Sequence, residues 1–177
     1  MMMIFGMVFS FAGQRFRIAS AFALAIFSGK IIFIIANQEN LQLAKQLLEK
    51  AEVTRSFKHV LTERMVEYCY FHEEQTRELD AWLISLNPGE LTKKTRVYLI
   101  ELCIIRGYSK EAFEYVSAYG SDGISPDLLL KMTVRRITET LYEYSETLVN
   151  LCVRLLQAEQ VHETLLRYLC MHYVGPT

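Results

Sequence analysis

The sequence has little of what usually interrupts helices or builds metal and redox sites. Its 177 residues include three prolines, eight glycines and four cysteines, and no two cysteines form a C-x-x-C pair. No stretch shows sustained alternation of apolar and polar residues, so we expect no β-sheet. No glycine-rich loop is followed by lysine and serine or threonine, which argues against a P-loop nucleotide site. These absences favour an all-helical protein.

Acidic residues are missing from positions 1–37, which carry three basic residues. The whole chain has a net charge of −1, so positions 38–177 carry a net charge of −4. Neither value gives the strong positive field that is typical of nucleic-acid binding, and the basic clusters further along the chain are short and flanked by acids. We therefore expect no nucleic-acid partner.

Three interpretations of the apolar N-terminal segment stay open. Residues 18–36 contain a single charged residue, Lys30. This run is barely long enough to cross a membrane. The two arginines before it also fit a signal sequence with a short apolar region. In the third interpretation, residues 22–36 form the first helix of a repeat, and residues 1–21 stay unassigned.

The four cysteines each lie in an apolar helical run, at positions 69, 103, 152 and 170. Free cysteine in such surroundings behaves as a small hydrophobic residue, so we expect four buried, reduced thiols. Reduced thiols indicate a reducing compartment, which favours the cytoplasm, with membrane association as the alternative. The nearby histidines do not share one helical face with the cysteines, so we expect no metal ion and no other cofactor.

Apolar residues recur at one regular spacing over three segments. The aligned sets include Ile35, Cys69 and Cys103; Leu48, Trp82 and Val116; and Ala44, Glu78 and Ala112. A period of about 34 residues is typical of tetratricopeptide-type repeats, in which a helix pair buries its apolar face against its neighbours. This repeat spacing therefore predicts stacked helix pairs.

Two short segments resemble the tetratricopeptide pattern directly. Ala44–Ala51 resembles the second helix of a repeat, and Gly107-Tyr108 followed by Ala112 resembles the turn and the first small residue. The resemblance covers about residues 24–120, and the middle pair departs from it because Glu78 replaces the small residue.

The segment 91–173 is similar to large uncharacterised tetratricopeptide-like proteins of anaerobic Gram-positive bacteria. The resemblance implies a right-handed α-solenoid of antiparallel helix pairs, part of a longer protein with no assigned activity. We expect an uncertain segment over 1–21, about three helix pairs over 22–120, and helices that continue the solenoid over 121–177.

Individual helices follow from apolar periodicity and from stop signals. We expect them over residues 22–36, 38–51, 56–72, 74–86, 92–106, 109–119, 126–140, 145–158 and 161–173. Gly107 is predicted to end one helix, and Ser109 and Ser125 are predicted to cap the next two. The glycine- and serine-bearing segment 120–125 is predicted to be a loop and a hinge.

Two glutamates occupy the same register on successive helices, within otherwise apolar runs. We interpret Glu67 and Glu101 as carboxylates on one concave surface. Tyr70, Tyr98 and Phe71 on the same helices are candidate aromatic anchors for a partner segment. The alternative, in which the glutamates are ordinary surface charges and the tyrosines belong to the core, stays open.

No convergent polar cluster suggests catalysis, so we predict a non-enzymatic scaffold that binds a protein or peptide segment. The alternative function is that of a helical protein tethered to a membrane by residues 18–36.

Overall fold

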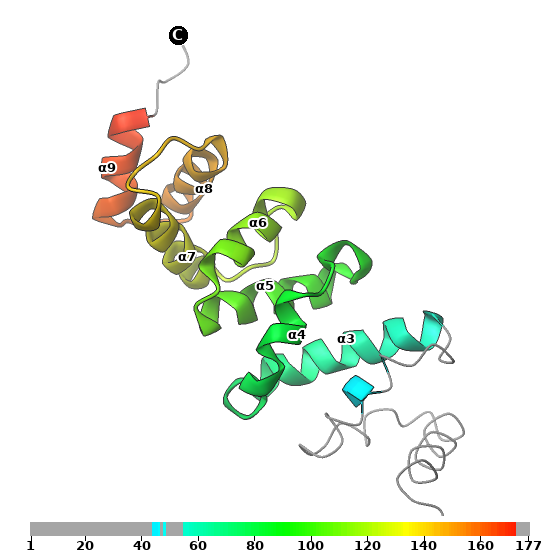
Figure 1. The fold of residues 1–177 in the computed structure, drawn as a ribbon. Coiled ribbons are helices and arrows are strands. Elements are labelled where there is room, and N and C mark those ends of the chain that lie inside the picture. The colour runs from blue at the N-terminus through cyan, green and yellow to red at the C-terminus, as the bar shows by residue number, and fades with distance from the viewer. Residues whose placement is uncertain (1–43, 47, 49–54, 173–177) are drawn as a thin grey trace, which may run out of the picture. The chain divides into compact units, whose positions relative to one another are not determined.

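The computed structural model describes residues 44–46, 48 and 55–172 (Figure 1). The chain divides into two compact units, Met1–Tyr68 and Cys69–Thr177. The described residues form helices, turns and loops and include no strand, which confirms the all-α prediction for that part of the chain. No helix among them is long and apolar enough to cross a membrane. The segment 18–36 and its three interpretations lie outside the described residues.

The helices follow one another through short connections. They are α3 (Arg55–Phe71), the 3₁₀ helix η2 (Glu73–Leu79), α4 (Asp80–Ile84), the 3₁₀ helix η3 (Pro88–Glu90), α5 (Lys93–Arg106), α6 (Ser109–Tyr119), α7 (Pro126–Glu139), α8 (Glu146–Gln157) and α9 (Glu163–His172). Hydroxyl groups cap α5 and α8: Thr92 accepts the Thr95 N–H at 3.4 Å, and Ser145 accepts the Leu148 N–H at 3.4 Å. These caps satisfy amide groups that have no partner within the helix.

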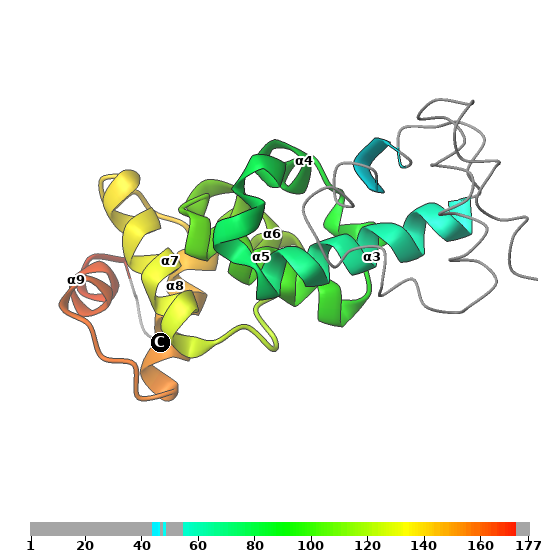
Figure 2. The same cartoon turned by 90° about the horizontal axis from the view of Figure 1, so that it is seen from below.

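Within the second unit, each helix from α5 to α9 packs against its neighbour in the chain. In addition, α5 contacts α7, and α7 contacts α9 (Figures 1 and 2). This leaves α5 and α7 enclosed on more than one side. Six consecutive residues of α5, Leu99 to Ile104, are buried for this reason.

The repeat spacing describes α3, α5 and α7 well. Met65 and Leu99 are buried one spacing apart, and so are Cys69, Cys103 and Ile137. Equivalent positions of the repeat are therefore buried on these helices.

The spacing fails for η2 and α4, which lie between α3 and α5 in the chain. Glu78 is exposed and Trp82 is only half-buried, whereas their chain neighbours Leu79 and Leu83 are fully buried. The register predicted for the second helix of the middle pair, 74–86, is therefore wrong by one residue. The single-residue shift also resolves the conflict of a glutamate at a position that should hold a small buried side chain.

Two further local predictions are corrected. The helix expected over 74–86 is replaced by η2 and α4. Within η2, Thr76 has non-helical dihedral angles (φ −119°, ψ 17°), and its hydroxyl donates to the His72 carbonyl at 2.9 Å. Ser109 does not cap α6. Tyr108 is the N-cap, and the Ser109 hydroxyl lies 3.0 Å from both carboxylate oxygens of Glu139.

Three of the four cysteines are buried free thiols, as predicted, but Cys170 is exposed on α9. Burial is the largest cause that raises the pKa of Cys69 to about 11 and the pKa values of Cys103 and Cys152 to about 12. The thiolate is the reactive form, so these three thiols should react slowly in the native state.

Thiol titration should therefore detect one fast thiol in the native protein and four after denaturation. A Cys170→Ser variant should have no fast thiol and three after denaturation. A second fast thiol in the native wild type, or a fast thiol that survives in the variant, would show that the buried cysteines are accessible.

Candidate functional site

An aromatic cluster forms where the end of α3 meets α5, within the second unit. It consists of Tyr70, Phe71 and Tyr98. The rings of Tyr70 and Tyr98 are stacked with centroids 4.3 Å apart, and Phe71 meets Tyr98 edge to face at 5.7 Å. Phe71 is 62% exposed. A large aromatic side chain held in place and left open to solvent is typical of a protein-binding hot spot.

Local sequence explains why the cluster is exposed. Phe71 is the last residue of α3, so no further helical turn covers it. Tyr98 directly precedes the buried Leu99 and lies at the edge of the packed face of α5. One turn earlier on the same helix, the Lys94 ammonium lies 5.3 Å from the centre of the Tyr98 ring. This cation–π contact places a positive charge at the rim of the cluster.

Glu101 is buried and binds Tyr70 of the cluster through a hydrogen bond, so its carboxylate does not face solvent. Only 5% of the residue is exposed. One carboxylate oxygen accepts the Tyr70 hydroxyl at 2.7 Å, and the other accepts the Ser125 N–H at 2.7 Å. The prediction of a solvent-facing carboxylate at 101 is therefore wrong. A carboxylate can remain in this interior position because both oxygens have hydrogen-bond donors.

A second missed prediction concerns Ser125. Ser125 precedes α7, but its side chain makes no capping hydrogen bond. The backbone N–H of Ser125 itself donates a hydrogen bond to the Glu101 carboxylate. This places the carboxylate at the positive end of the helix dipole. The hydrogen bond to Glu101 is also the largest cause that raises the pKa of Tyr70 to about 12, so the Tyr70 hydroxyl stays protonated at neutral pH.

Glu67 belongs to the other compact unit, Met1–Tyr68. Its carboxylate binds the Arg64 guanidinium at 2.6 Å, one helical turn earlier on α3. The structure thus brings together three of the four predicted site residues: Tyr70, Tyr98 and Glu101. The sequence also indicated Phe71 as a candidate anchor but not its exposure, and it gave no sign of Lys94 at the rim.

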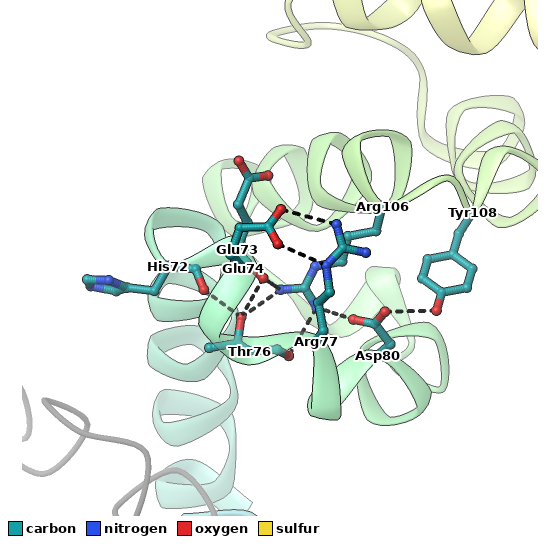
Figure 3. A network of polar contacts seen from close by, with 8 residues as sticks. All are labelled: His72, Glu73, Glu74, Thr76, Arg77, Asp80, Arg106 and Tyr108. Atoms are coloured by element: carbon teal, nitrogen blue, oxygen red, sulfur yellow. Dashed lines mark hydrogen bonds and ion pairs between the residues drawn. The ribbon is translucent and has the colours of Figure 1, made fainter.

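A buried arginine fixes the chain that leaves the cluster (Figure 3). Arg106, the last residue of α5, has a side chain that is 1% exposed. Its guanidinium donates to the Glu73 carbonyl at 2.9 Å, to the Thr76 carbonyl at 3.2 Å and to the Thr76 hydroxyl at 2.6 Å. It also binds the Asp80 carboxylate.

Tyr108 completes this network by donating to the second oxygen of Asp80 at 2.8 Å, a hydrogen bond that raises the pKa of Tyr108. All these contacts lie just after Phe71 in the chain or at the end of α5. Arg106 therefore ties η2 and the start of α4 to the end of α5. The network joins distant parts of the sequence with no distinctive motif, so nothing in the sequence pattern indicated it.

Within the part of the chain that the structure describes, no group of three or more histidine, cysteine or acidic residues could hold a metal ion. The aromatic cluster and its support are thus a set of apolar and hydrogen-bonded groups. Such a surface can bind another molecule by ring contact, and its one buried carboxylate is already engaged.

Comparison with known proteins gives one match. A family model described as "Family of unknown function (DUF5717) N-terminal" matches residues 18–143. This span includes the aromatic cluster, Glu101 and Arg106. No curated protein and no solved structure matches the chain.

Proposed function

Because the chain belongs to the DUF5717 N-terminal family, whose function is unknown, we propose a role from its own residues: a non-enzymatic helical-repeat scaffold that binds a segment of a partner protein. The proposed architecture is a right-handed α-solenoid of antiparallel helix pairs resembling tetratricopeptide repeats. The contacts of α5 with α7 and of α7 with α9 support it, as does the repeat spacing of buried residues on α3, α5 and α7. Scaffolds of this kind commonly bind other proteins.

The single observation that carries the proposal is the exposed Phe71 ring beside Tyr98. The neighbouring ring of Tyr70 is stacked on Tyr98 and held by the Glu101 carboxylate. Rings that are already fixed lose little conformational entropy when a partner binds. We propose that a partner segment places an apolar side chain against Phe71 and Tyr98. Ring contact would provide the affinity, with Lys94 affecting selectivity at the rim.

The buried Glu101 changes the expected chemistry of the partner. A concave acidic groove would favour a basic segment, but this carboxylate makes two internal hydrogen bonds and is almost closed to solvent. The charge beside the rings is that of a lysine. The proposed partner segment is therefore apolar at its centre, and a basic character is not required of it.

A Phe71→Ser variant tests the proposal. Short peptides should be selected from a random display library on the wild-type protein, and their dissociation constants measured on both proteins. We expect at least a tenfold loss of affinity, because truncation of a hot-spot aromatic residue costs about 2 kcal/mol or more. The fold should be unaffected, since Phe71 is largely exposed.

Val161→Ser is the matched control, because Val161 is also an exposed apolar residue but lies between α8 and α9. It should leave the affinity unchanged. A library that yields no binding peptides, or peptides that bind the Phe71→Ser variant as tightly as the wild type, would contradict the proposal.

A further inference from the structure

Helices α5 and α7 of the second unit end with the same hydrogen-bond pattern, but they have different residues at its left-handed position. α5 ends with Gly107 in the left-handed region (φ 90°), where Gly107 N–H donates to Ile104 and Tyr108 N–H donates to Cys103. This pair of hydrogen bonds is the Schellman motif, which strongly favours glycine at the left-handed position. α7 ends with the same pattern: Leu141 N–H donates to Thr138 at 3.2 Å, and Tyr142 N–H donates to Ile137 at 2.9 Å.

Leu141 occupies the glycine position of that motif, one repeat spacing after Gly107. Its φ is 51°, and the next residue, Tyr142, also has a positive φ of 62°. The left-handed conformation is unfavourable for side chains with a Cβ atom. Leu141 is also 87% exposed, so it gains no burial that would offset this conformation. Neither backbone geometry nor core packing explains a leucine here.

Helix α9 holds this unfavourable loop in place. The buried Tyr168 hydroxyl donates to the Glu143 carbonyl at 2.9 Å and accepts the Ser145 N–H at 2.8 Å. The His172 ring nitrogen Nε2 lies 2.7 Å from the Tyr142 carbonyl. Strained backbone persists where the surroundings fix it, and it is concentrated at binding and catalytic sites. The loop 141–144 is thus presented in one conformation.

The loop carries a second exposed apolar side chain, and it contains one exposed carboxylate and is followed by another. Tyr144 is 62% exposed and touches the His172 ring edge-on, with centroids 5.7 Å apart. Glu143 lies within the loop, and Glu146 follows it in the chain. Both are exposed, and neither makes an ion pair with any of the residues described in the structure. An exposed leucine and tyrosine with acidic residues beside them complement an apolar surface that is edged by lysine or arginine.

We propose that the loop 141–144 is a second docking surface, separate from the aromatic cluster, for a cationic amphipathic helix of a partner protein. Leu141 and Tyr144 contact the apolar face of that helix, and Glu143 and Glu146 contact its basic edge. A leucine remains at the glycine position because its side chain is used in binding.

Leu141→Gly tests the proposal by separating stability from binding. The probe is a synthetic helical peptide with leucine on one face and lysine on the other, and binding is followed by fluorescence anisotropy. We expect the variant to melt about 2–4 °C higher than the wild type, because glycine relieves the left-handed position. We expect its affinity for the peptide to fall at least fivefold. Tyr144→Ser, which leaves the strained backbone unchanged, should lower the affinity as well.

Glu159→Gly is the matched control. Glu159 holds the same left-handed position at the end of α8 (φ 60°), with Gln160 N–H donating to Leu155 at 2.9 Å. This variant should also gain thermal stability but should bind the peptide within twofold of the wild type. Phe71→Ser should bind it as the wild type does, so a failure of the aromatic cluster can be told apart from a failure of this loop.

Three results would overturn the proposal. The first is no binding of the lysine peptide to the wild type, or equal binding of a peptide with glutamate in place of lysine. The second is wild-type affinity in both Leu141→Gly and Tyr144→Ser. The third is binding of the wild type to anionic lipid vesicles in a manner that depends on Leu141, which would assign the loop to a membrane surface.

Discussion

Replacing Arg106 with methionine should lower the free energy of unfolding by about 3–5 kcal/mol, since it removes one partner of a buried ion pair. The guanidinium binds two backbone carbonyl groups of η2, the Thr76 hydroxyl and the Asp80 carboxylate. Methionine has a similar length but no donors, so these acceptors would lose the hydrogen bonds that Arg106 donates in an interior position. Each such buried group costs about 1–3 kcal/mol.

Urea denaturation measures this effect through the midpoint, at an unchanged dependence on denaturant. Arg77→Met is the matched control, because Arg77 forms an exposed ion pair with Glu74 at 3.2 Å. Exposed pairs contribute about 0–1 kcal/mol, so this variant should unfold almost as the wild type does. If the two arginine variants had equal midpoints, Arg106 would not organise η2 as the structure indicates.

Ala112→Glu should be destabilising by several kcal/mol, since it places a carboxylate at a fully buried position of α6. The sequence spacing identified position 112 as a buried small residue of a second helix, and the burial of Ala112 confirms this. The same spacing placed Glu78 at an equivalent buried site, where the structure has Leu79 instead.

Ala118→Glu makes the same chemical change at an exposed position of the same helix. It should shift the melting temperature by less than about 2 °C, since exposed substitutions usually change stability by no more than about 0.5 kcal/mol. A melting temperature for Ala112→Glu within that range of the wild type would show that the interface of α6 is open.

Much of the fold was predictable from the sequence because the relevant signals are local. Gly107 ends α5 in the left-handed conformation, and Ser145 caps α8, at the boundaries that their sequence positions indicated. Apolar spacing also placed Cys69 and Cys103 correctly in the core. These outcomes depend on a few neighbouring residues and on one helical face.

The remaining errors have a tertiary origin. Thr76 has non-helical dihedral angles within a predicted helix, and its hydroxyl and carbonyl are bound by Arg106 from the end of α5. The Ser125 side chain makes no cap, and its own N–H donates to Glu101, a residue from another helix. Cys170 has apolar sequence neighbours like the buried cysteines, but it lies on the outer face of α9. No local pattern separates these cases from the correct ones.

For the candidate site, the sequence indicated Tyr70, Tyr98 and Glu101 but assigned the wrong role to the glutamate. The three residues fall on two predicted helices, 56–72 and 92–106, and the structure joins them by stacking and by a hydrogen bond. Register gives no information about the depth of a side chain. For that reason the carboxylate was expected at the surface, and the exposure of Phe71, also a candidate anchor, was not predicted.

The central claim, that the aromatic cluster binds a partner segment, is tested most directly by mapping a selected peptide onto the folded protein by NMR. We expect the largest changes in amide chemical shift at Phe71, Lys94 and Tyr98. We also expect that these changes disappear in the Phe71→Ser variant, while the rest of its spectrum matches that of the wild type. Shift changes confined to other parts of the second unit, with the cluster unperturbed, would contradict the claim.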